Sequence, residues 1–355
     1  MLKIHLIAGA RPNLIKVAPL LSTLEIEKNI DVKFIYTGQH YDKNLFTEIL
    51  FDMNIRRPDI NFKIGLGSPN FQISKIIKKY NKYLEKNIPD LIIVFGDVNS
   101  TLAAAITAKK NNIKLAHVEA GLRCYDDSLP EEVNRRLTDS ISDYLFTPSV
   151  YENKNLLKEN IKKKDFCVGN IMIDSLIKFL FFRKNFIQKY KNIDGVLTLH
   201  RPENVDNKRR LIEIISELKE WTKYHKILFP IHPRTKKKLT EFNLNVNLNT
   251  ITNLRVCDPL NYNDFLLQIC KSNFVITDSG GIQEETSYLG IPCFTIRKNT
   301  ERPITITKGT NKLVNIKEIS KYLKSIKKKR TKIPKWDGKT SFRILKILKK
   351  EFGIK

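Results

Sequence analysis

Three carboxylates in the first half of the chain follow short apolar runs that predict buried strands. Asp97 comes just after the run 91–95, Glu119 directly after the run 115–118, and Glu131 opens a predicted helix shortly afterwards. Carboxylates at the ends of neighbouring parallel strands converge, and crowding and burial raise some of their pKa values, which suits general acid and base catalysis. Taken alone, Asp97 could be a helix N-cap and Glu131 a first-turn carboxylate favoured by the helix dipole. The set of three predicts an acid–base site.

A second cluster follows the apolar run 274–277, where a Ser-Gly-Gly turn leads into a predicted helix. The turn consists of Ser279, Gly280 and Gly281. Its backbone N–H groups and the helix N-terminus favour an anion, and Glu285, one turn further on, would accept hydrogen bonds from a diol such as a ribose. A second run, 292–297, leads to Arg302 beside the same turn. A helix N-cap with an ion-paired loop is the alternative, but the two segments together favour a nucleotide-phosphate site.

Other polar side chains follow further predicted strands. Arg11 and Lys16 come after the first strand and would reach a phosphate or a sugar, or else be two solvated cations. In the second half, His200 follows a strand, where it could contact a diphosphate or assist a leaving group, and His232 repeats the arrangement one strand later. The remaining candidates are His40, as a polar site residue or a loop histidine, and Phe265, as a base-stacking or a core residue.

The elements that position these residues alternate between apolar runs and amphipathic helical stretches. The predicted strands are 4–8, 32–36, 91–95, 115–118, 144–147 and 166–168 in the first half, and 196–199, 227–231, 255–257, 274–277, 293–296 and 313–315 in the second. Such alternation predicts an α/β protein with parallel sheets covered by helices on both faces. We expect two doubly wound Rossmann-like domains, residues 1–172 and 173–340, facing a cleft, with a helix within 341–355 packing back on the first domain.

Composition narrows the class of protein. The 355 residues are 41% hydrophobic, enough for two globular domains. No apolar run approaches the roughly 20 residues that cross a bilayer, and the cysteines are far apart without a Cys-x-x-Cys pair, which is typical of reduced thiols in a cytoplasmic protein. The formal charge of +26 comes from widely spread lysines and lacks a nucleic-acid motif. We therefore expect a solvated basic surface, no nucleic-acid partner and no stable membrane insertion.

Several classes of site are not supported by the motifs. Histidine and acidic residues do not fall at metal-ligand spacings such as His-Glu-x-x-His, and no Gly-x-Gly-x-x-Gly follows the first strand. Ser279 lacks the Gly-x-Ser-x-Gly context of a hydrolase nucleophile. The sequence therefore predicts neither a metal nor a nicotinamide cofactor.

Taken together, these segments resemble the non-hydrolysing UDP-N-acetylglucosamine 2-epimerase family over almost the whole chain. The segments that carry the resemblance are GARP at 9–12 with Lys16, TGQH at 37–40, GD at 96–97, HVEAGLR at 117–123, PEE at 130–132 with Asn134 and Arg135, HR at 200–201, TDSGGIQEE at 277–285 and TERP at 300–303. The resemblance implies a glycosyltransferase-B (GT-B) fold and a cofactor-free inversion at C2 that interconverts UDP-GlcNAc and UDP-ManNAc. In this family UDP is thought to be eliminated across C1–C2 to leave a 2-acetamidoglucal, and then to add back.

The resemblance also implies a role for each candidate residue. Asp97, Glu119 and Glu131 become the acid–base candidates, and Arg11, Lys16 and His200 contact the diphosphate or the sugar, with His200 counted among the catalytic residues. The implied nucleotide contacts are Ser279, Gly280 and Gly281 for phosphate, Glu285 for ribose, Arg302 beside them, and Phe265 with the backbone near Leu260 for uracil. Gln39, His40 and His232 match a region that binds a second, activating UDP-GlcNAc in some members.

Some positions depart from the usual family pattern. Ala10 and Asn13 stand where Thr and Glu are usual, the stretch 123–129 is short, and 200–206 is closer to the branch that acts on related sugars such as UDP-2,3-diacetamido-glucuronic acid. The alternatives are therefore an epimerase of such a sugar, a hydrolysing epimerase that releases ManNAc, a GT-B glycosyltransferase, or a UDP-sugar sensor without activity. The resemblance further implies a homodimer that serves polysaccharide biosynthesis.

Overall fold

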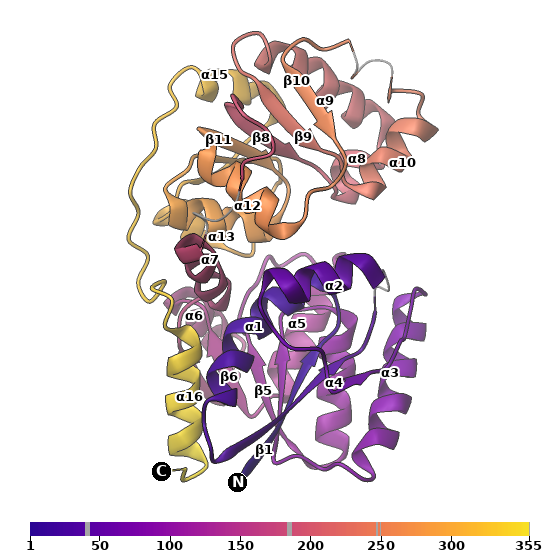
Figure 1. Ribbon diagram of the computed structural model, residues 1–355, viewed down its shortest axis with the longest axis vertical. Helices are drawn as coiled ribbons and strands as arrows, with labels where there is room; N and C mark the ends of the chain where they lie inside the picture. The colour runs from indigo at the N-terminus through magenta and orange to yellow at the C-terminus, as the bar shows by residue number, and fades with distance from the viewer. Residues whose placement is uncertain (40–42, 183–186, 246–247, 249, 355) are drawn as a thin grey trace. The chain divides into compact units, whose positions relative to one another are not determined.

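The computed structural model describes residues 1–39, 43–182, 187–245, 248 and 250–354. The chain forms two compact units (Figure 1). The N-terminal unit comprises residues 1–178 and 334–355, and the C-terminal unit comprises residues 179–333. The boundaries expected from the sequence, 172/173 and 340/341, differ from the observed ones by six and seven residues. The first crossing falls inside helix α7 (Ile171–Phe182), and the second precedes the final helix.

The N-terminal unit is built on a seven-stranded sheet in the order β3-β2-β1-β4-β5-β6-β7, in which every neighbouring pair is parallel. Its strands are β1 (Leu2–Ala8), β2 (Ile30–Tyr36), β3 (Ile60–Asn61), β4 (Leu91–Phe95), β5 (Lys114–Val118), β6 (Tyr144–Thr147) and β7 (Lys164–Cys167). Its helices are α1 (Arg11–Glu25), α2 (Lys43–Asp52), α3 (Pro69–Leu84), α4 (Asn99–Lys110), α5 (Pro130–Ile141), α6 (Val150–Lys158), most of α7, and α16 (Thr340–Glu351).

Side-chain size and periodicity explain how the helices cover this sheet. Strand β4 is apolar and buried at every position, as expected for a parallel strand with helices on both faces. Helix α3 buries Ile76, Tyr80 and Leu84, which recur every four residues on one face. In α4, the small residues Ala103 to Ala105 are fully buried, so neighbouring helices approach its backbone closely.

The last helix, α16, packs on the N-terminal unit although it follows the whole C-terminal unit in sequence (Figure 1). The backbone N–H groups of Thr340 and Ser341 donate to the buried carboxylate of Asp174, at 3.1 and 2.8 Å. Lys349 pairs with Glu27 at 2.9 Å. Helix α16 therefore completes the fold of a unit whose other elements all begin before residue 179.

The C-terminal unit contains a six-stranded parallel sheet in the order β10-β9-β8-β11-β12-β13. Its strands are β8 (Gly195–Thr198), β9 (Ile227–Pro230), β10 (Leu254–Cys257), β11 (Phe274–Thr277), β12 (Cys293–Thr295) and β13 (Asn311–Leu313). Its helices are α8 (Pro202–Val205), α9 (Lys208–Trp221), α10 (Pro233–Glu241), α12 (Tyr262–Lys271), α13 (Gly280–Leu289), α14 (Pro303–Thr307), η2 (Ile316–Glu318) and α15 (Ile319–Leu323).

Both sheets confirm the predicted class of two doubly wound α/β domains. All the strands expected from the sequence form within two residues of their predicted bounds, whereas β3, only two residues long, was missed. In each sheet the strand order reverses at one point, between β1 and β4 and between β8 and β11. In doubly wound sheets ligands bind at such switch points, outside the carboxyl ends of the strands.

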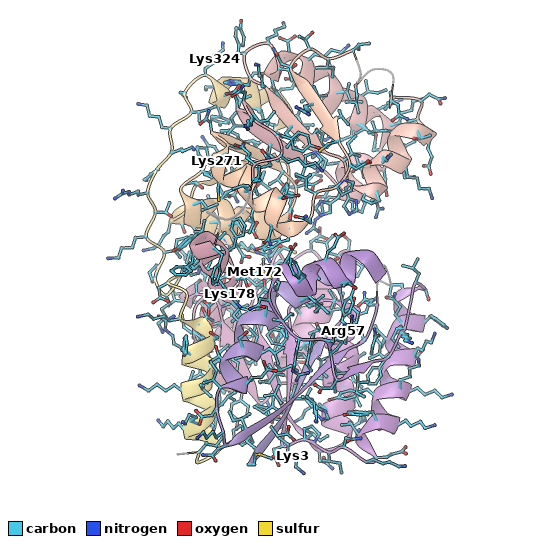
Figure 2. All side chains as sticks on the ribbon, in the orientation of Figure 1. Lys3, Arg57, Met172, Lys178, Lys271 and Lys324 are labelled. Carbon is cyan, nitrogen blue, oxygen red and sulfur yellow. The ribbon has the colours of Figure 1, made fainter. Side chains whose placement is uncertain are left out.

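The surface carries many of the chain's cations. Lys3, Lys271 and Lys324 are exposed and come from distant parts of the sequence (Figure 2). No helix in the described part of the chain combines the length and apolar character needed to cross a membrane.

Candidate active site

Strand register brings the predicted polar residues of the N-terminal unit to one edge of its sheet. Ile7 of β1 lies opposite Val94 of β4, and Phe95 of β4 lies opposite Val118 of β5. The segments that carry Lys16, Asp97 and Glu119 therefore leave the sheet together, next to the switch point between β1 and β4.

Glu119 and Lys16 form a buried ion pair at this edge. Glu119 has a φ of 74°, a left-handed conformation that costs a non-glycine residue roughly 1–2 kcal/mol. The N–H groups of Glu119 and Ala120 both donate to Phe146 O, at 3.0 and 3.1 Å, which holds the turn in place. The pair lies against Gly96, because a Cβ at that position would be 2.8 Å from Lys16 Nζ and 3.2 Å from Glu119 Oε2. Tight packing thus fixes the Glu119 carboxylate at the end of the sheet.

Asp97 is held by Arg135 of α5. The guanidinium of Arg135 pairs with the Asp97 carboxylate, and Asn134 Nδ2 donates to Asp97 O at 2.9 Å. The N-cap alternative for Asp97 is wrong, since α4 begins at Asn99 and its N-cap is Val98, without a side-chain cap. In the sequence, Arg135 stands out only as part of a motif. Nothing there indicates that it pairs with Asp97, because the two residues are far apart along the chain.

Glu131 and Glu132 lie next to each other in α5 but have different environments. Glu131 is exposed in the first turn. Glu132 is fully buried and accepts hydrogen bonds from the N–H groups of Cys124 and Tyr125 and, at 2.5 Å, from Arg135. The structure therefore brings Asp97 and Glu119 to the same edge with buried or half-buried partners, whereas Glu131 presents its carboxyl to solvent.

Behind Glu119 lies a buried network of hydrogen bonds and ion pairs that the sequence did not predict. His117 contacts Gly96 O through Nε2 at 2.8 Å and Asp139 through Nδ1 at 2.7 Å. Asp139 also accepts from Gly121 N–H at 3.0 Å and Arg123 NH1 at 2.7 Å. Burial opposes the charge of Asp139, but His117 and Arg123 together hold the pKa of this carboxyl below its usual range. The network ties the loops on both sides of Glu119 to helix α5.

The first helix meets the same edge through Asn13, one of the residues that departs from the family pattern. Asn13 accepts from Ala10 N–H at 3.1 Å and donates to Phe95 O at 2.9 Å, so it joins the start of α1 to the end of β4. Arg11 is the first residue of α1, but its side chain lies outside the described part of the structure. Gln39 is buried and its side chain accepts from Ser100, and His40 lies outside the described residues.

In the C-terminal unit, His200 follows β8 and Asp278 follows β11, on the two strands of the switch point. His200 Nδ1 lies 3.1 Å from the Asp278 carboxylate, which also accepts from the N–H groups of His200 and Arg201. Burial opposes ionisation of Asp278, but these partners lower its pKa overall. His232 caps helix α10, and its ring centroid is 5.2 Å from that of His200. His200 and His232, which follow different strands, thus lie side by side.

The Ser-Gly-Gly turn opens helix α13. Ser279 is the N-cap of α13 without a side-chain cap, so the first N–H groups of this helix are not satisfied by that side chain. Arg302 and Glu301 lie directly against Gly280, where a Cβ would come within 2.5 Å of Arg302 NH1 and 2.7 Å of Glu301 Oε1. Backbone donors, the helix dipole and a guanidinium therefore converge on one turn.

Glu285 lies one turn into α13 and is buried. Its Oε1 accepts from the hydroxyl of Tyr262 at 2.8 Å, a partner that the sequence reading missed. Burial, with a smaller contribution from Glu284, raises the pKa of Glu285 to about 8. Phe265 packs half-buried against a core cluster that includes Ile269 and Ile282, and Leu260 is half-buried in the loop after β10.

The raised pKa predicts a pH-dependent stability that Glu285→Gln removes. Below about pH 4.5 the carboxyl of Glu285 is protonated in both the folded and the unfolded state, whereas between about pH 4.5 and 8 it is protonated only in the folded state. Rising pH therefore destabilises the wild type relative to Glu285→Gln, by at most about 1.4 kcal/mol per pH unit. Urea unfolding at a series of pH values measures the difference.

The matched control is Glu213→Gln, which replaces an exposed carboxylate on α9. We expect this variant to keep the wild-type pH dependence. A wild-type curve parallel to that of Glu285→Gln over pH 4.5–8 would contradict the assignment.

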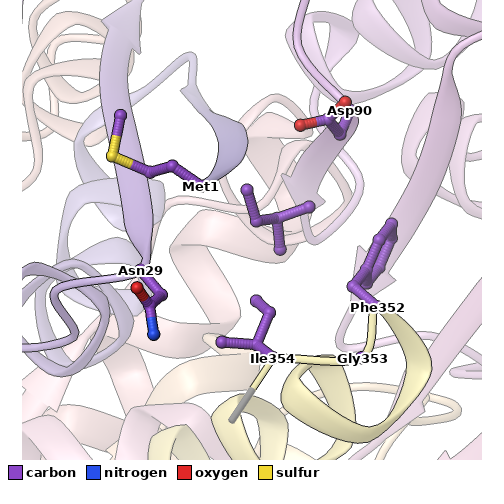
Figure 3. A pocket seen from close by; sticks show the side chains of 7 residues that line it. Met1, Asn29, Asp90, Phe352, Gly353 and Ile354 are labelled. Carbon is purple, nitrogen blue, oxygen red and sulfur yellow. The ribbon is translucent and has the colours of Figure 1, made fainter.

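The cavity seen in Figure 3 lies away from these residues. It measures about 560 Å³ and is lined by Met1, Leu2, Asn29, Asp90, Phe352, Gly353 and Ile354. Leu2 begins β1 and Asp90 precedes β4, so the cavity adjoins the amino ends of the strands. The polar cluster lies at the carboxyl ends, and the cavity is therefore not part of it.

Comparison with known proteins identifies the family. Residues 22–349 match the family model described as UDP-N-acetylglucosamine 2-epimerase. A UDP-N-acetylglucosamine 2-epimerase from Methanocaldococcus jannaschii is 41% identical over 98% of this chain and 99% of the relative. A UDP-2,3-diacetamido-2,3-dideoxy-D-glucuronate 2-epimerase from Pseudomonas aeruginosa is 35% identical over 88% of each chain.

A crystal structure of the M. jannaschii UDP-GlcNAc 2-epimerase in complex with UDP-GlcNAc and UDP matches with a TM-score of 0.90 at 40% identity, over 98% of this chain and 100% of the other. Sequence and structural similarity extend over both units, including all the strands that carry the polar clusters. This chain belongs to the UDP-N-acetylglucosamine 2-epimerase family.

Proposed function

We propose that this protein interconverts UDP-GlcNAc and UDP-ManNAc without net hydrolysis. The observation that carries the proposal is the buried Glu119–Lys16 pair against Gly96, with the Asp97–Arg135 pair next to it. An inversion at carbon needs proton removal and proton return, and fixed carboxylates are suitable groups for both. The similarity to the M. jannaschii enzyme supports the choice of sugar.

The proposed reaction has two balanced steps. In the first, a carboxylate removes the C2 proton, the C1–O bond to the β-phosphate breaks, and UDP leaves with the bonding electron pair. The product is a 2-acetamidoglucal with a C1=C2 double bond. In the second, a β-phosphate oxygen of UDP attacks C1, while an acid delivers a proton to C2 from the opposite face. Asp97 and Glu119 are the proposed pair, and Glu131 is the third candidate.

Retention of UDP decides between epimerisation and hydrolysis. We assign this task to the turn at 279–281 with Arg302, which presents backbone donors and a guanidinium to the diphosphate, and to Glu285, which accepts from the ribose. His200, aligned by Asp278, is proposed to contact the departing phosphate. Escape of UDP would leave free glycal that cannot return to the nucleotide sugar.

Incubation with UDP-GlcNAc in deuterated water tests the reaction. We expect deuterium at C2 of both epimers at equilibrium, with free UDP and free sugar below about 5% of the total, because the acid–base groups exchange protons with solvent while bound UDP is retained. NMR spectroscopy measures both. Epimerisation without deuterium uptake would contradict the elimination, and accumulation of ManNAc and UDP would indicate a hydrolysing enzyme instead.

A related UDP-sugar is the second candidate substrate. The segment 200–206 resembles the branch that acts on UDP-2,3-diacetamido-glucuronic acid, and one such enzyme is 35% identical to this chain. Running the same exchange on both sugars distinguishes the two, since only the true substrate is deuterated rapidly. An enzyme of the GT-B type that transfers sugar to an acceptor would exchange neither.

A further inference from the structure

A row of four side chains with alternating charges lies next to the Ser-Gly-Gly turn of the C-terminal unit. Arg297 NH2 pairs with Glu301 Oε2 at 2.9 Å, the other oxygen of Glu301 pairs with Arg302, and Arg302 Nε pairs with Glu284 Oε1 at 3.0 Å. All four side chains are at least nine-tenths buried. Charged groups at this depth interact strongly because water screens them poorly.

The two arginines and the two glutamates of this row carry equal and opposite charge. Arg302 and Glu301 both lie against Gly280, and Arg302 is flanked by Glu284 and Glu301. Two carboxylates would more than cancel one guanidinium and leave the turn repulsive to an anion. Arg297, two residues after β12, supplies the missing positive charge on the far side of Glu301.

Arg297 is itself poorly satisfied by its surroundings. Within the described residues, neither its Nε nor its NH1 has a hydrogen-bond partner, although the side chain is only 2% exposed. A buried, incompletely bonded guanidinium is costly for stability. A gain in stability therefore does not explain the presence of Arg297 at this place.

We infer that Arg297 is a positioning residue for diphosphate binding: it neutralises Glu301 so that Arg302 keeps a net attraction for the phosphates at the glycine turn. This inference rests on the proposed UDP site. It assigns no direct contact between Arg297 and the ligand. The effect should therefore appear for ligands that carry the diphosphate and not for the nucleoside alone.

Four proteins test the inference: the wild type, Arg297→Gln, Glu301→Gln and the double variant Arg297→Gln/Glu301→Gln. Arg297→Gln is expected to weaken UDP binding about tenfold to a hundredfold. Uridine binding is expected to change by less than about threefold, since it depends on the ribose and base contacts. The double variant restores the charge balance, and the Gln amide oxygen still accepts from Arg302, so its UDP affinity should return close to that of the wild type.

Calorimetry with UDP and ligand-observed NMR with uridine provide the readouts, and thermal unfolding confirms that each variant is folded. Equal losses for UDP and uridine, or a double variant no tighter than Arg297→Gln, would overturn the inference and leave Arg297 as a structural residue. If Arg297→Gln does not fold, Glu301→Gln and the double variant still test the inference. Glu301→Gln keeps the positive charge of Arg297, which the double variant lacks, and should therefore bind UDP at least about threefold more tightly than the double variant.

The result also separates this inference from the proposed function. A wild-type protein that binds no UDP would overturn both. A wild type that binds UDP, together with an Arg297→Gln variant that binds it equally well, would overturn only the role of Arg297.

Discussion

Glu119→Gln is expected to lower the rate of epimerisation by about 10²–10⁴-fold and to leave UDP affinity nearly unchanged. The amide keeps the shape of the side chain and its oxygen still accepts from Lys16, so the buried turn at Glu119 stays in place. The amide cannot take up or deliver a proton as a carboxyl group does. Deuterium uptake at C2 measures the chemistry, and calorimetry with UDP measures binding.

Glu85→Gln serves as the control because Glu85 is exposed at the end of α3, outside the proposed site. We expect it to retain wild-type exchange. Exchange by Glu119→Gln at the rate of the control would remove Glu119 from the acid–base pair, and the assignment would then pass to Asp97 and Glu131.

Gly96→Ala is expected to reduce turnover on the order of a hundredfold, through displacement of the same ion pair. The added Cβ would lie 2.8 Å from Lys16 Nζ and 3.2 Å from Glu119 Oε2, and both side chains are buried, so one of them must move. Gly96 also has a φ of 62°, which adds backbone strain to any residue with a side chain. Steady-state rates and thermal unfolding separate the two effects.

Gly65→Ala is a matched control for the strain. Gly65 has a φ of 80°, but a Cβ there would have no neighbour within 4 Å. We expect Gly65→Ala to lose a similar amount of stability, about 1 kcal/mol, and to keep its activity. Equal losses of activity in the two variants would show that strain, and not the Lys16–Glu119 contact, is responsible.

Much of the fold could be predicted because it depends on local patterns. Strands β4 and β11 occupy their predicted ranges, since an apolar run between polar turns is a strong signal for a buried parallel strand. Strand β3 has only two residues and carries no such pattern. The sequence predicts a domain boundary at 172/173, whereas the division falls after residue 178, inside helix α7.

The candidate site was predictable in part. Asp97, Glu119 and the turn at 279–281 follow strands β4, β5 and β11 as the sequence predicted, because connections in α/β folds place such residues at one edge of a sheet. Glu131 and Glu132 show the limit. Glu132, Arg135 and Asp139 recur at intervals of three and four along α5 and are buried, and this spacing was the signal that Glu131 lies on another face.

The sequence by itself determined the alternation of strands and helices, the order of the motifs and hence the family. These properties depend on residues close together along the chain. Tertiary structure alone decided which strands adjoin, and so placed Lys16 against Glu119, Arg135 against Asp97 and Tyr262 against Glu285. Such pairs form because packing of the apolar faces brings distant segments together, and burial then makes each charge dependent on its partner.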